Sequence, residues 1–362
     1  MKQNCNRRRR EKRMKKNRIF SMIMAASLLI TSVTAGLAGQ NNTIKAQAAD
    51  PVVICIDPGH GGTGGRNLGA QYNGISEKQV TLITANAMKA ELEKYENVKV
   101  YMTRTTDTVM SLKDRADYAK AVGADFLYCI HFNSSIAHDL YGSEVWVSAY
   151  GSMYQQGYSF ASVETAQLQA LGLYQRGIKT KLGSQGDYYG ILRYATADGV
   201  PCALIEHCYV DHGVDLSFLK KSNSYQLLGI ADATAVAKYY HLKSASLGVD
   251  YSGYQNVSVA APKTPVANDL TAPEVCKIDS AVYDKTSKTV TAKVTAKDSG
   301  SPIIYYSYSF DGGKTYSYLL PWDRTKTTDT VSIPNPKGAS TLIIRAHNQY
   351  DFYTPSSAYT IN

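Results

Sequence analysis

The sequence predicts an α/β domain followed by a small all-β sandwich. Between Pro51 and about Leu242, short apolar segments alternate with segments of helical periodicity. This alternation indicates a mostly parallel mixed sheet flanked by helices. From Ala272 onward, apolar and polar residues alternate and helical periodicity is absent, which indicates an antiparallel sandwich. A chain of 362 residues is also long for one domain.

The first 48 residues have the pattern of a secretory signal peptide. A basic stretch up to Arg18 precedes an apolar run over 19–37, and Ala46-Gln47-Ala48 forms a small-x-small cleavage site. The alternative is an uncleaved membrane anchor, although the run is rich in Ala, Ser, Thr and Gly. We predict cleavage, and a mature chain that is secreted, extracellular or cell-wall associated, with no stable membrane insertion.

The net charge of +9 belongs to this leader and not to the mature chain. Eleven of the 39 Lys and Arg and one of the 30 Asp and Glu lie in residues 1–48, which leaves 28 basic and 29 acidic residues from residue 49 onward. A nearly neutral mature chain has no general attraction to nucleic acid. We therefore predict no nucleic-acid partner. We also expect a monomer.

Five cysteines follow the leader, and their odd number does not resemble a disulfide framework. Those at 55, 129 and 202 lie within apolar strand-like runs, where a free thiol acts as a small buried hydrophobe. The five are Cys55, Cys129, Cys202, Cys208 and Cys276.

The strands of the first domain are predicted where apolar runs end in turn signals, and its helices where apolar residues recur every three or four positions. In the first helix, for example, Val80, Ile83 and Ala87 have this spacing. The predicted strands are Val52–Ile56, Val98–Thr103, Phe126–Phe132, Glu144–Ser148 and Cys202–His207. The predicted helices are Glu77–Tyr95, Leu112–Val122, Ser162–Gln175 and Tyr225–Tyr240.

Residues 49–242 are thus predicted to form the first domain, 243–271 a linker and 272–362 an immunoglobulin-like sandwich. The linker is rich in Ser, Ala, Pro, Val and Asn and has little periodicity. In the sandwich, Asp311-Gly312-Gly313 is a hairpin turn. The predicted strands include Val290–Ala296, Ile303–Phe310, Tyr316–Leu320, Thr330–Ile333 and Leu342–Ala346.

The most informative segment is Asp57-Pro58-Gly59-His60-Gly61, which closes the first predicted strand. Proline and glycine force a turn there, so His60 lies at the carboxyl end of a strand, where α/β folds usually bind ligands. An imidazole in that place can hold a metal ion. Zinc in hydrolases typically has three protein ligands, commonly His and Glu, and an open position for water.

Further candidates for such a site follow later in the sequence. Glu77 begins the first predicted helix after Ser76, although an acid there is also favoured by the helix dipole with Ser76 as the cap. His131 ends the buried strand that begins at Phe126; a lone histidine there is more often structural. Glu206 ends another apolar strand, and a carboxylate buried there requires a metal, a proton or a salt bridge to compensate its charge.

With these residues, the chain resembles the secreted zinc-dependent N-acetylmuramoyl-L-alanine amidases of the type 3 family. The matching segments keep the same order over residues 51–242. They are Ile56-Asp57-Pro58-Gly59-His60-Gly61-Gly62, Gly69-Ala70, Ser76-Glu77-Lys78, Thr103-Arg104-Thr105-Thr106-Asp107, Leu112, Arg115, Ile130-His131-Phe132-Asn133, Gly142-Ser143-Glu144-Val145, Arg176-Gly177-Ile178-Lys179, Leu192-Arg193 and Pro201-Cys202-Ala203-Leu204-Ile205-Glu206.

The resemblance implies that His60, Glu77 and His131 bind Zn²⁺ and that Glu206 is the catalytic carboxylate. Zinc would activate water, and Glu206 would transfer its proton to the leaving amine. The implied reaction breaks the amide between N-acetylmuramic acid and L-alanine in peptidoglycan. Asn133 and Arg193 are expected substrate contacts, with a strand-end hydrogen bonder and a surface charge as the alternatives.

Several segments depart from the family pattern or allow two interpretations. After Glu206 the chain continues with His207 and Cys208, which can bind metals, but alternation turns His207 to the other face and Cys208 is expected beyond the strand end. Residues 150–159 form either a mobile flap or an ordinary surface loop. The segment 309–316 resembles one Asp-box hairpin, and the tyrosines around it stack on sugars or pack in the sandwich.

Two other functions compete with the amidase. The same metal apparatus could cleave the stem peptide, as a zinc carboxypeptidase or endopeptidase. A wall-binding protein with an inactive catalytic domain is disfavoured, because all four candidate residues are present.

Overall fold

The computed structural model describes residues 50–65 and 67–362, so the predicted signal peptide lies outside the described residues. The described chain belongs to one compact unit that ends at Asn362. None of the helices in this part of the chain is both long and apolar enough to cross a membrane.

The unit contains a six-stranded sheet with the strand order β4-β1-β5-β10-β6-β7. The strands β4, β1, β5 and β10 are parallel, whereas β6 pairs antiparallel with β10 and parallel with β7. The prediction of a mostly parallel mixed sheet is therefore confirmed. The strands are β1 (Val52–Pro58), β4 (Val98–Met102), β5 (Phe126–Asn133), β6 (Ser143–Val147), β7 (Gln175–Lys179) and β10 (Cys202–Tyr209).

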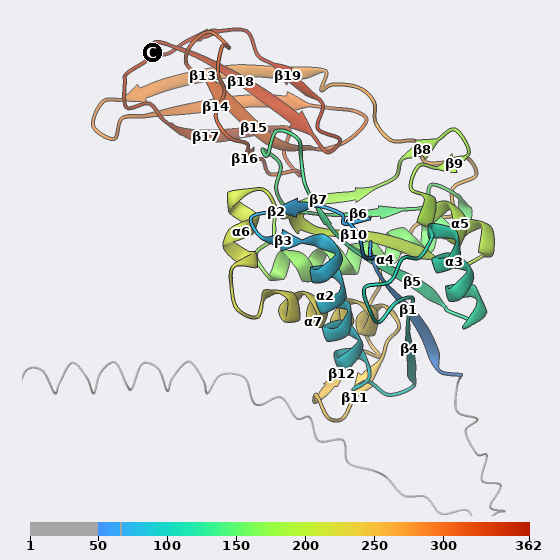
Figure 1. The fold of residues 1–362 in the computed structure, drawn as a ribbon. Helices are drawn as coiled ribbons and strands as arrows, with labels where there is room; N and C mark the ends of the chain where they lie inside the picture. The colour runs from blue at the N-terminus through green and yellow to red at the C-terminus, as the bar shows by residue number, and fades with distance from the viewer. Residues whose placement is uncertain (1–49, 66) are drawn as a thin grey trace, which may run out of the picture. The chain divides into compact units, whose positions relative to one another are not determined.

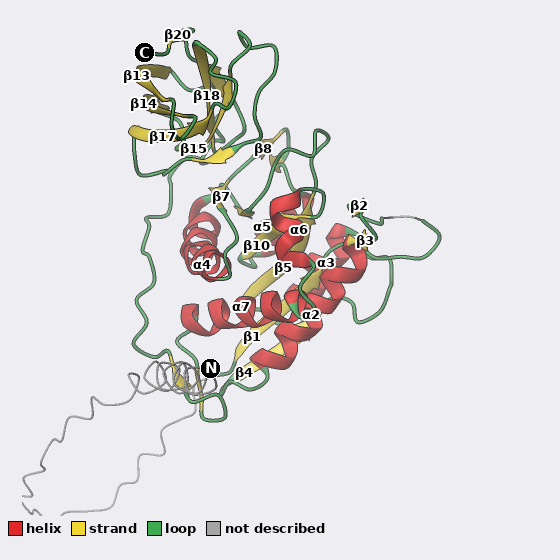
Figure 2. Cartoon of the chain, turned by 90° about the vertical axis from the view of Figure 1, so that its left-hand side faces the viewer, coloured by secondary structure: helices red, strands yellow, loops and turns green. Residues whose placement is uncertain are grey.

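Helices cover both faces of this sheet (Figure 1). Three helices, α2 (Glu77–Leu92), α4 (Gly151–Ala170) and α7 (Ser224–Tyr239), pack on one face, where Met88, Phe160 and Leu228 join the core. On the other face, α3 (Leu112–Ala121) and α5 (Gly190–Asp198) pack around Cys55, Cys129 and Cys202. A short helix, α6 (Gly213–Leu219), follows β10. Figure 2 shows the helices against the strands of the sheet.

The cysteines behave as the sequence predicts. All five that the structure describes are free, and those at 55, 129, 202 and 208 are buried. The prediction that Cys208 lies beyond the strand end is wrong, because β10 continues to Tyr209.

Two predictions for the segment between β6 and β7 are wrong. Residues 150–159 form neither a flap nor a loop, because α4 begins at Gly151. Gly157 lies so close to the sheet that an added Cβ would be 3.0 Å from the Cβ of Val147. Tertiary packing, and not an apolar pattern within one segment, supplies most of the stability of a helix in a folded protein. The predicted helix also ran to Gln175, which instead begins β7.

Short hairpins connect the larger elements. The pair β2 (Gln71–Tyr72) and β3 (Ile75–Ser76) leads directly into α2. The pair β8 (Leu182–Gly183) and β9 (Gly186–Asp187) leads into α5. The predicted linker begins with β11 (Lys243–Ser244) and β12 (Val249–Asp250).

Two antiparallel sheets make up the C-terminal part, as the sequence predicts. One has the order β13-β14-β17, and in the other β15 and β18 are central. They enclose a common core that includes Val294, Ile333 and Ile344. The strands are β13 (Val275–Asp284), β14 (Thr289–Lys297), β15 (Ile303–Ser309), β16 (Leu320–Pro321), β17 (Thr328–Pro334), β18 (Thr341–Asn348), β19 (Tyr353–Pro355) and β20 (Tyr359–Thr360).

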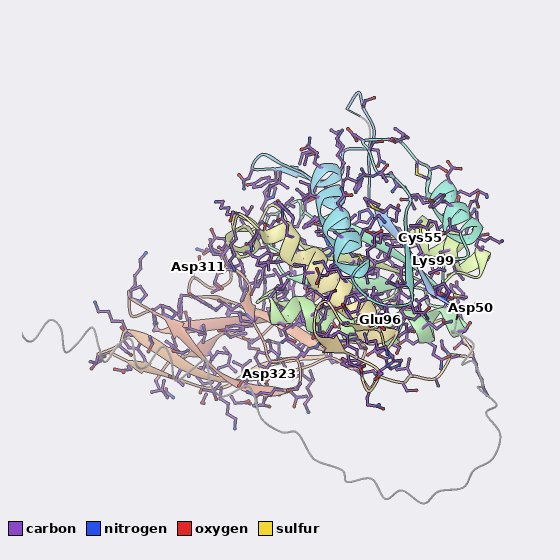
Figure 3. The ribbon with its side chains drawn as sticks, turned by 90° about the horizontal axis from the view of Figure 1, so that it is seen from below. Asp50, Cys55, Glu96, Lys99, Asp311 and Asp323 are labelled. Atoms are coloured by element: carbon purple, nitrogen blue, oxygen red, sulfur yellow. The ribbon has the colours of Figure 1, made fainter. Side chains whose placement is uncertain are left out.

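Most of the predicted strand Tyr316–Leu320 is wrong, since only Leu320 belongs to β16. The preceding loop is held by Asp311, whose carboxylate accepts hydrogen bonds from the backbone N–H groups of Lys314 and Thr315 at 3.0 Å. Figure 3 shows Asp311 and Asp323 on loops of these sheets. The loop connects β15 and β16, which pair antiparallel, so the predicted hairpin turn is confirmed.

Candidate active site

The loop that follows β1 is held in place by two buried arginines. Arg115 donates to Asp57 Oδ1 at 2.6 Å and to the carbonyl oxygens of Pro58 and His60 at 2.8 and 2.5 Å. Arg104 donates to the carbonyl oxygens of Pro58 and Gly59, both at 2.8 Å. These bonds hold a backbone in which His60 has a φ of 61°, in the left-handed region that is uncommon for residues other than glycine.

Replacing Asp57 with asparagine is expected to lower the free energy of unfolding by about 3 kcal/mol, because Arg115 is buried and would lose its charged partner. Urea denaturation of the mature chain measures this loss. Asp117→Asn, which breaks an exposed ion pair with Lys113, serves as the control and is expected to change little. Equal midpoints for Asp57→Asn and the unmodified protein would contradict the expectation.

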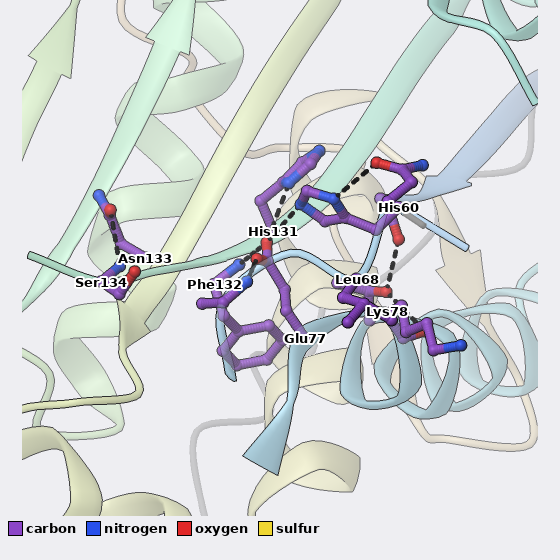
Figure 4. Close-up of polar contacts among 12 residues, drawn as sticks. His60, Leu68, Glu77, Lys78, His131, Phe132, Asn133 and Ser134 are labelled. Atoms are coloured by element: carbon purple, nitrogen blue, oxygen red, sulfur yellow. Dashed lines mark hydrogen bonds and ion pairs between the residues drawn. The ribbon is translucent and has the colours of Figure 1, made fainter. Parts of the chain in front are cut away.

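Three of the predicted site residues converge at the carboxyl ends of the strands. Nε2 of His60 lies 3.1 Å from Glu77 Oε1, and Nδ1 of His131 lies 3.0 Å from the same oxygen. The two imidazole rings are edge to face, with centroids 4.9 Å apart. Figure 4 shows both rings beside the Glu77 carboxylate. One ligand atom from each residue lies within 4.8 Å of the other two.

Glu77 is fixed by the backbone as well as by the histidines. Oε1 accepts from Phe132 N at 2.9 Å, and Oε2 accepts from Ala70 N at 2.6 Å. Burial alone would raise the pKa of Glu77, but hydrogen bonds from His131 and His60 outweigh it and hold that pKa well below its usual range. The carboxylate is therefore ionised at neutral pH. Ser76 precedes the helix but makes no capping bond with its side chain.

Two glycines leave space for this cluster. A Cβ on Gly59 would collide with the ring of His131, and a Cβ on Gly69 would collide with the Glu77 carboxylate. Gly69 also has a φ of +68°, a conformation that glycine adopts without strain. Both positions lie in segments that carry the resemblance described above.

Glu206 lies next to the cluster on β10, where it pairs with His131 of β5. The residue is partly exposed, but Oε2 is buried and has no hydrogen-bond partner. Burial, followed by the charges of Glu77 and Glu144, raises the pKa of Glu206 well above its usual value. His60, Glu77, His131 and Glu206 all line one cavity of about 500 Å³.

The donor set fits a divalent metal ion. Two imidazole nitrogens and one carboxylate oxygen form a typical three-ligand set for catalytic zinc. Glu206 lines the same cavity as these three residues, so its side chain lies beside the groups that would hold the ion. The residues present therefore suit the predicted ion, and their role as its ligands stays a prediction.

The two expected substrate contacts lie in different places. Asn133 lines the cavity and donates from Nδ2 to Glu144 Oε1 at 3.1 Å. Arg193 is not among the lining residues. Its Nη1 donates to the carbonyl oxygen of Asp187 at 2.7 Å. A substrate-binding role for either side chain stays a prediction.

His207 lies outside this cluster, as strand alternation predicts. It is buried and stacks on Phe132. Its Nε2 lies 3.0 Å from Asp232 Oδ1, and its Nδ1 lies 3.1 Å from the carbonyl oxygen of His131. Together with Glu164 and Asp232 it forms a second, fully buried group of metal-capable side chains.

No function was predicted from the sequence for Arg104, Arg115 or Glu144, although all three lie within the segments that match the amidase family. Arg104 and Arg115 shape the loop that carries His60, and Glu144 binds Asn133. Their positions next to apolar strands indicated that they could be buried, and a buried charged residue almost always has a partner. Their partners lie far away along the chain and could not be identified from local pattern.

Comparison with known proteins identifies related sequences. A family profile described as N-acetylmuramoyl-L-alanine amidase matches residues 54–238. The sporulation-specific N-acetylmuramoyl-L-alanine amidase of Bacillus subtilis is 33% identical over 224 residues, which are 61% of this chain and 79% of that protein. The amidase CwlM of Bacillus licheniformis is 30% identical over 61% of this chain and 79% of its own length.

Solved structures are also similar to this chain. An N-acetylmuramoyl-L-alanine amidase from Clostridium difficile 630 has a TM-score of 0.47 and 24% identity, over 53% of this chain and 98% of that one.

Proposed function

Because the chain belongs to the N-acetylmuramoyl-L-alanine amidase family, we propose that it is a secreted, zinc-dependent peptidoglycan hydrolase. It would cleave the amide between N-acetylmuramic acid and L-alanine. The observation that carries the proposal is the convergence of His60, Glu77 and His131 beside Glu206 in one cavity.

His60, Glu77 and His131 would hold the zinc ion. When bound, zinc would polarise the scissile carbonyl and make a water molecule more acidic. The hydrogen bonds from Ala70 N and Phe132 N keep the Glu77 carboxylate in place, and Asn67 Oδ1 lies 3.1 Å from Nδ1 of His60. Such outer contacts orient metal ligands and support metal affinity.

Glu206 would act as the proton carrier. Its side chain lines the cavity beside the predicted metal ligands, where the carboxylate would accept the proton of the attacking water and return it to the departing amide nitrogen. The amide carbon gains the water oxygen, and the nitrogen gains the proton. The products are a lactyl carboxylate on the sugar and a free amino group on L-alanine.

Product analysis tests the proposal. Mass spectrometry of a purified muropeptide after digestion by the mature chain is expected to show intact stem peptides with a free L-alanine amine and a peptide-free sugar. Shortened stems that stay attached to the sugar would instead identify a carboxypeptidase or endopeptidase. An unchanged muropeptide would exclude both activities on this substrate.

The location of the protein follows from the leader. A signal peptide over residues 1–48 would export a catalytic domain over 49–242, a linker over 243–271 and a sandwich domain over 272–362. Peptidoglycan, the substrate implied by the related amidases, lies outside the cytoplasmic membrane, so export would bring the enzyme to its substrate.

A further inference from the structure

A group of buried charges lies between the candidate active site and the C-terminal sheets. Its centre is Glu144 on β6, which is 3% exposed. Oε1 accepts from Asn133 Nδ2 and Trp146 Nε1, both at 3.1 Å. Oε2 accepts from Arg176 Nε at 2.7 Å and Lys179 Nζ at 2.6 Å. Four donors thus surround one carboxylate. Trp146 lies on the same strand, Arg176 and Lys179 lie on the adjacent β7, and Asn133 lies on β5, which β10 separates from β6.

Glu144 is also next to the candidate catalytic residue. It pairs directly with Glu206 in the antiparallel register of β6 and β10. Burial alone would raise the pKa of Glu144, but the charges of Lys179 and Arg176 lower it to about 2. An ionised carboxylate in this place orients the Asn133 amide at the cavity wall and raises the pKa of Glu206 through its charge.

Arg176 connects Glu144 to the C-terminal part of the chain. Its side chain is 0% exposed. Nη2 donates to both carboxylate oxygens of Asp351 at 2.8 Å, and Nη1 donates to the Tyr305 hydroxyl at 3.3 Å. Asp351 lies between β18 and β19, and Tyr305 lies on β15, so both partners belong to the sandwich. The Tyr305 hydroxyl in turn donates to the Tyr141 carbonyl oxygen.

Asp351 completes the charge balance of this group. Glu144 and Asp351 carry two negative charges, and Arg176 and Lys179 carry two positive charges. Without Asp351 the buried group would carry an excess positive charge and one unpaired guanidinium nitrogen. The Asp351 side chain is 37% exposed, whereas Arg176 is fully buried. Loss of the Asp351 charge is costly because the Arg176 guanidinium stays desolvated. Arg176 would therefore shift toward solvent or toward Glu144.

We propose that the C-terminal sandwich is a positioning element of the active site, in which Asp351 holds Arg176 and thereby fixes Glu144 beside Asn133 and Glu206. The inference rests on the proposed amidase function and adds a role for residues outside the catalytic fold. Asp351 touches neither the cavity nor the predicted metal ligands. It is a positioning residue.

Asp351→Asn in the full mature chain tests this role. On a soluble muropeptide, kcat is expected to fall about 10-fold, a typical size for coupling through a packed polar network. KM is expected to stay the same, because Asp351 does not line the cavity. Asp351→Glu keeps the charge but places a longer side chain at a backbone φ of 70°, which favours Asp and Asn over Glu, so it is expected to retain more of kcat than Asp351→Asn and less than the original protein. An unchanged kcat in Asp351→Asn would overturn the proposal.

Tyr174→Phe provides the matched control. The Tyr174 hydroxyl donates to the carbonyl oxygens of Ile304 and Trp322 in the sandwich, so this variant loses polar contacts to the sandwich without changing the charged group. It is expected to lower the melting temperature but to leave kcat unchanged. An equal loss of kcat in both variants would show that weakened packing, and not Glu144, explains the effect.

A second measurement does not depend on amidase activity. The chain has two tryptophans. The Trp146 indole donates to Glu144, and the Trp322 indole donates to the Lys326 carbonyl oxygen at 3.0 Å. In ¹⁵N-labelled protein, Asp351→Asn is expected to shift the Trp146 indole resonance and to leave that of Trp322 in place. Trp322→Phe assigns the two signals.

Amidase activity and the Trp146 resonance together distinguish a failure of the proposed amidase function from a failure of the positioning role of Asp351. If the original protein cleaves no muropeptide, the proposed function fails, and the Trp146 resonance still decides whether Asp351 positions Glu144. If the protein is an amidase and the resonance does not move in Asp351→Asn, the positioning role is wrong and the proposed function stands.

Discussion

Replacing Glu206 with glutamine is expected to reduce kcat for amide cleavage by about 10²–10⁴-fold, the usual contribution of a positioned general acid–base. Glutamine has nearly the same shape as glutamate but cannot accept and return a proton. The three predicted metal ligands are unchanged, so the bound metal per chain is expected to equal that of the original protein. Rates on a soluble muropeptide and metal analysis by mass spectrometry check both statements.

Glu164→Gln is the control for this variant. Glu164 is also buried, and burial raises its pKa well above the usual value. It lies on α4 and does not line the cavity. Glu164→Gln is therefore expected to leave kcat unchanged. If Glu206→Gln kept a rate within a few-fold of the original protein, Glu206 would not be the proton carrier.

Replacing His131 with alanine is expected to remove the bound metal and to reduce the rate by about 10³-fold or more, because metal catalysis lowers the activation barrier by several kcal/mol. Two ligands would remain where catalytic zinc normally has three. The metal content of the purified variant and its rate with and without added zinc are the measurements. In the original protein, a chelator is expected to abolish activity and added zinc to restore it.

His138→Ala is the control for His131→Ala, because it removes a nearby histidine that is not a predicted metal ligand. His138 lies five residues beyond the end of β5, and its Nδ1 lies 2.8 Å from Asp211. It does not line the cavity. This variant is expected to keep its metal and its rate. A His131→Ala variant that still bound one zinc per chain and remained active would rule out the proposed ligand set.

Local sequence pattern was sufficient to predict most strands of the central sheet. β1, β5 and β10 are apolar runs with clear ends, and each was predicted to within two residues of its observed end. His60, His131 and Glu206 could be found because each follows or ends such a run, at the sheet edge where parallel strands present their ligands. Glu77 was identified by its place at the start of a helix.

Other elements could not be predicted, because their stability depends on distant partners. β7 contains Arg176 and Lys179, which are buried only because Glu144 and Asp351 pair with them. The start of α4 has little apolar periodicity and depends on the close contact of Gly157 with Val147. In both cases the residues that stabilise the element lie on other strands.

The sequence by itself determined most of the central strands and the longer helices, the sandwich that follows them and the four candidate side chains, since all of these appear as short-range patterns of polarity. Only the tertiary structure decided that a single Glu77 oxygen lies between two imidazoles and that Asp351 reaches Arg176. The physical reason is that buried charges are stable only beside partners, and which groups become partners depends on chain segments that are far apart in sequence and meet only in the fold.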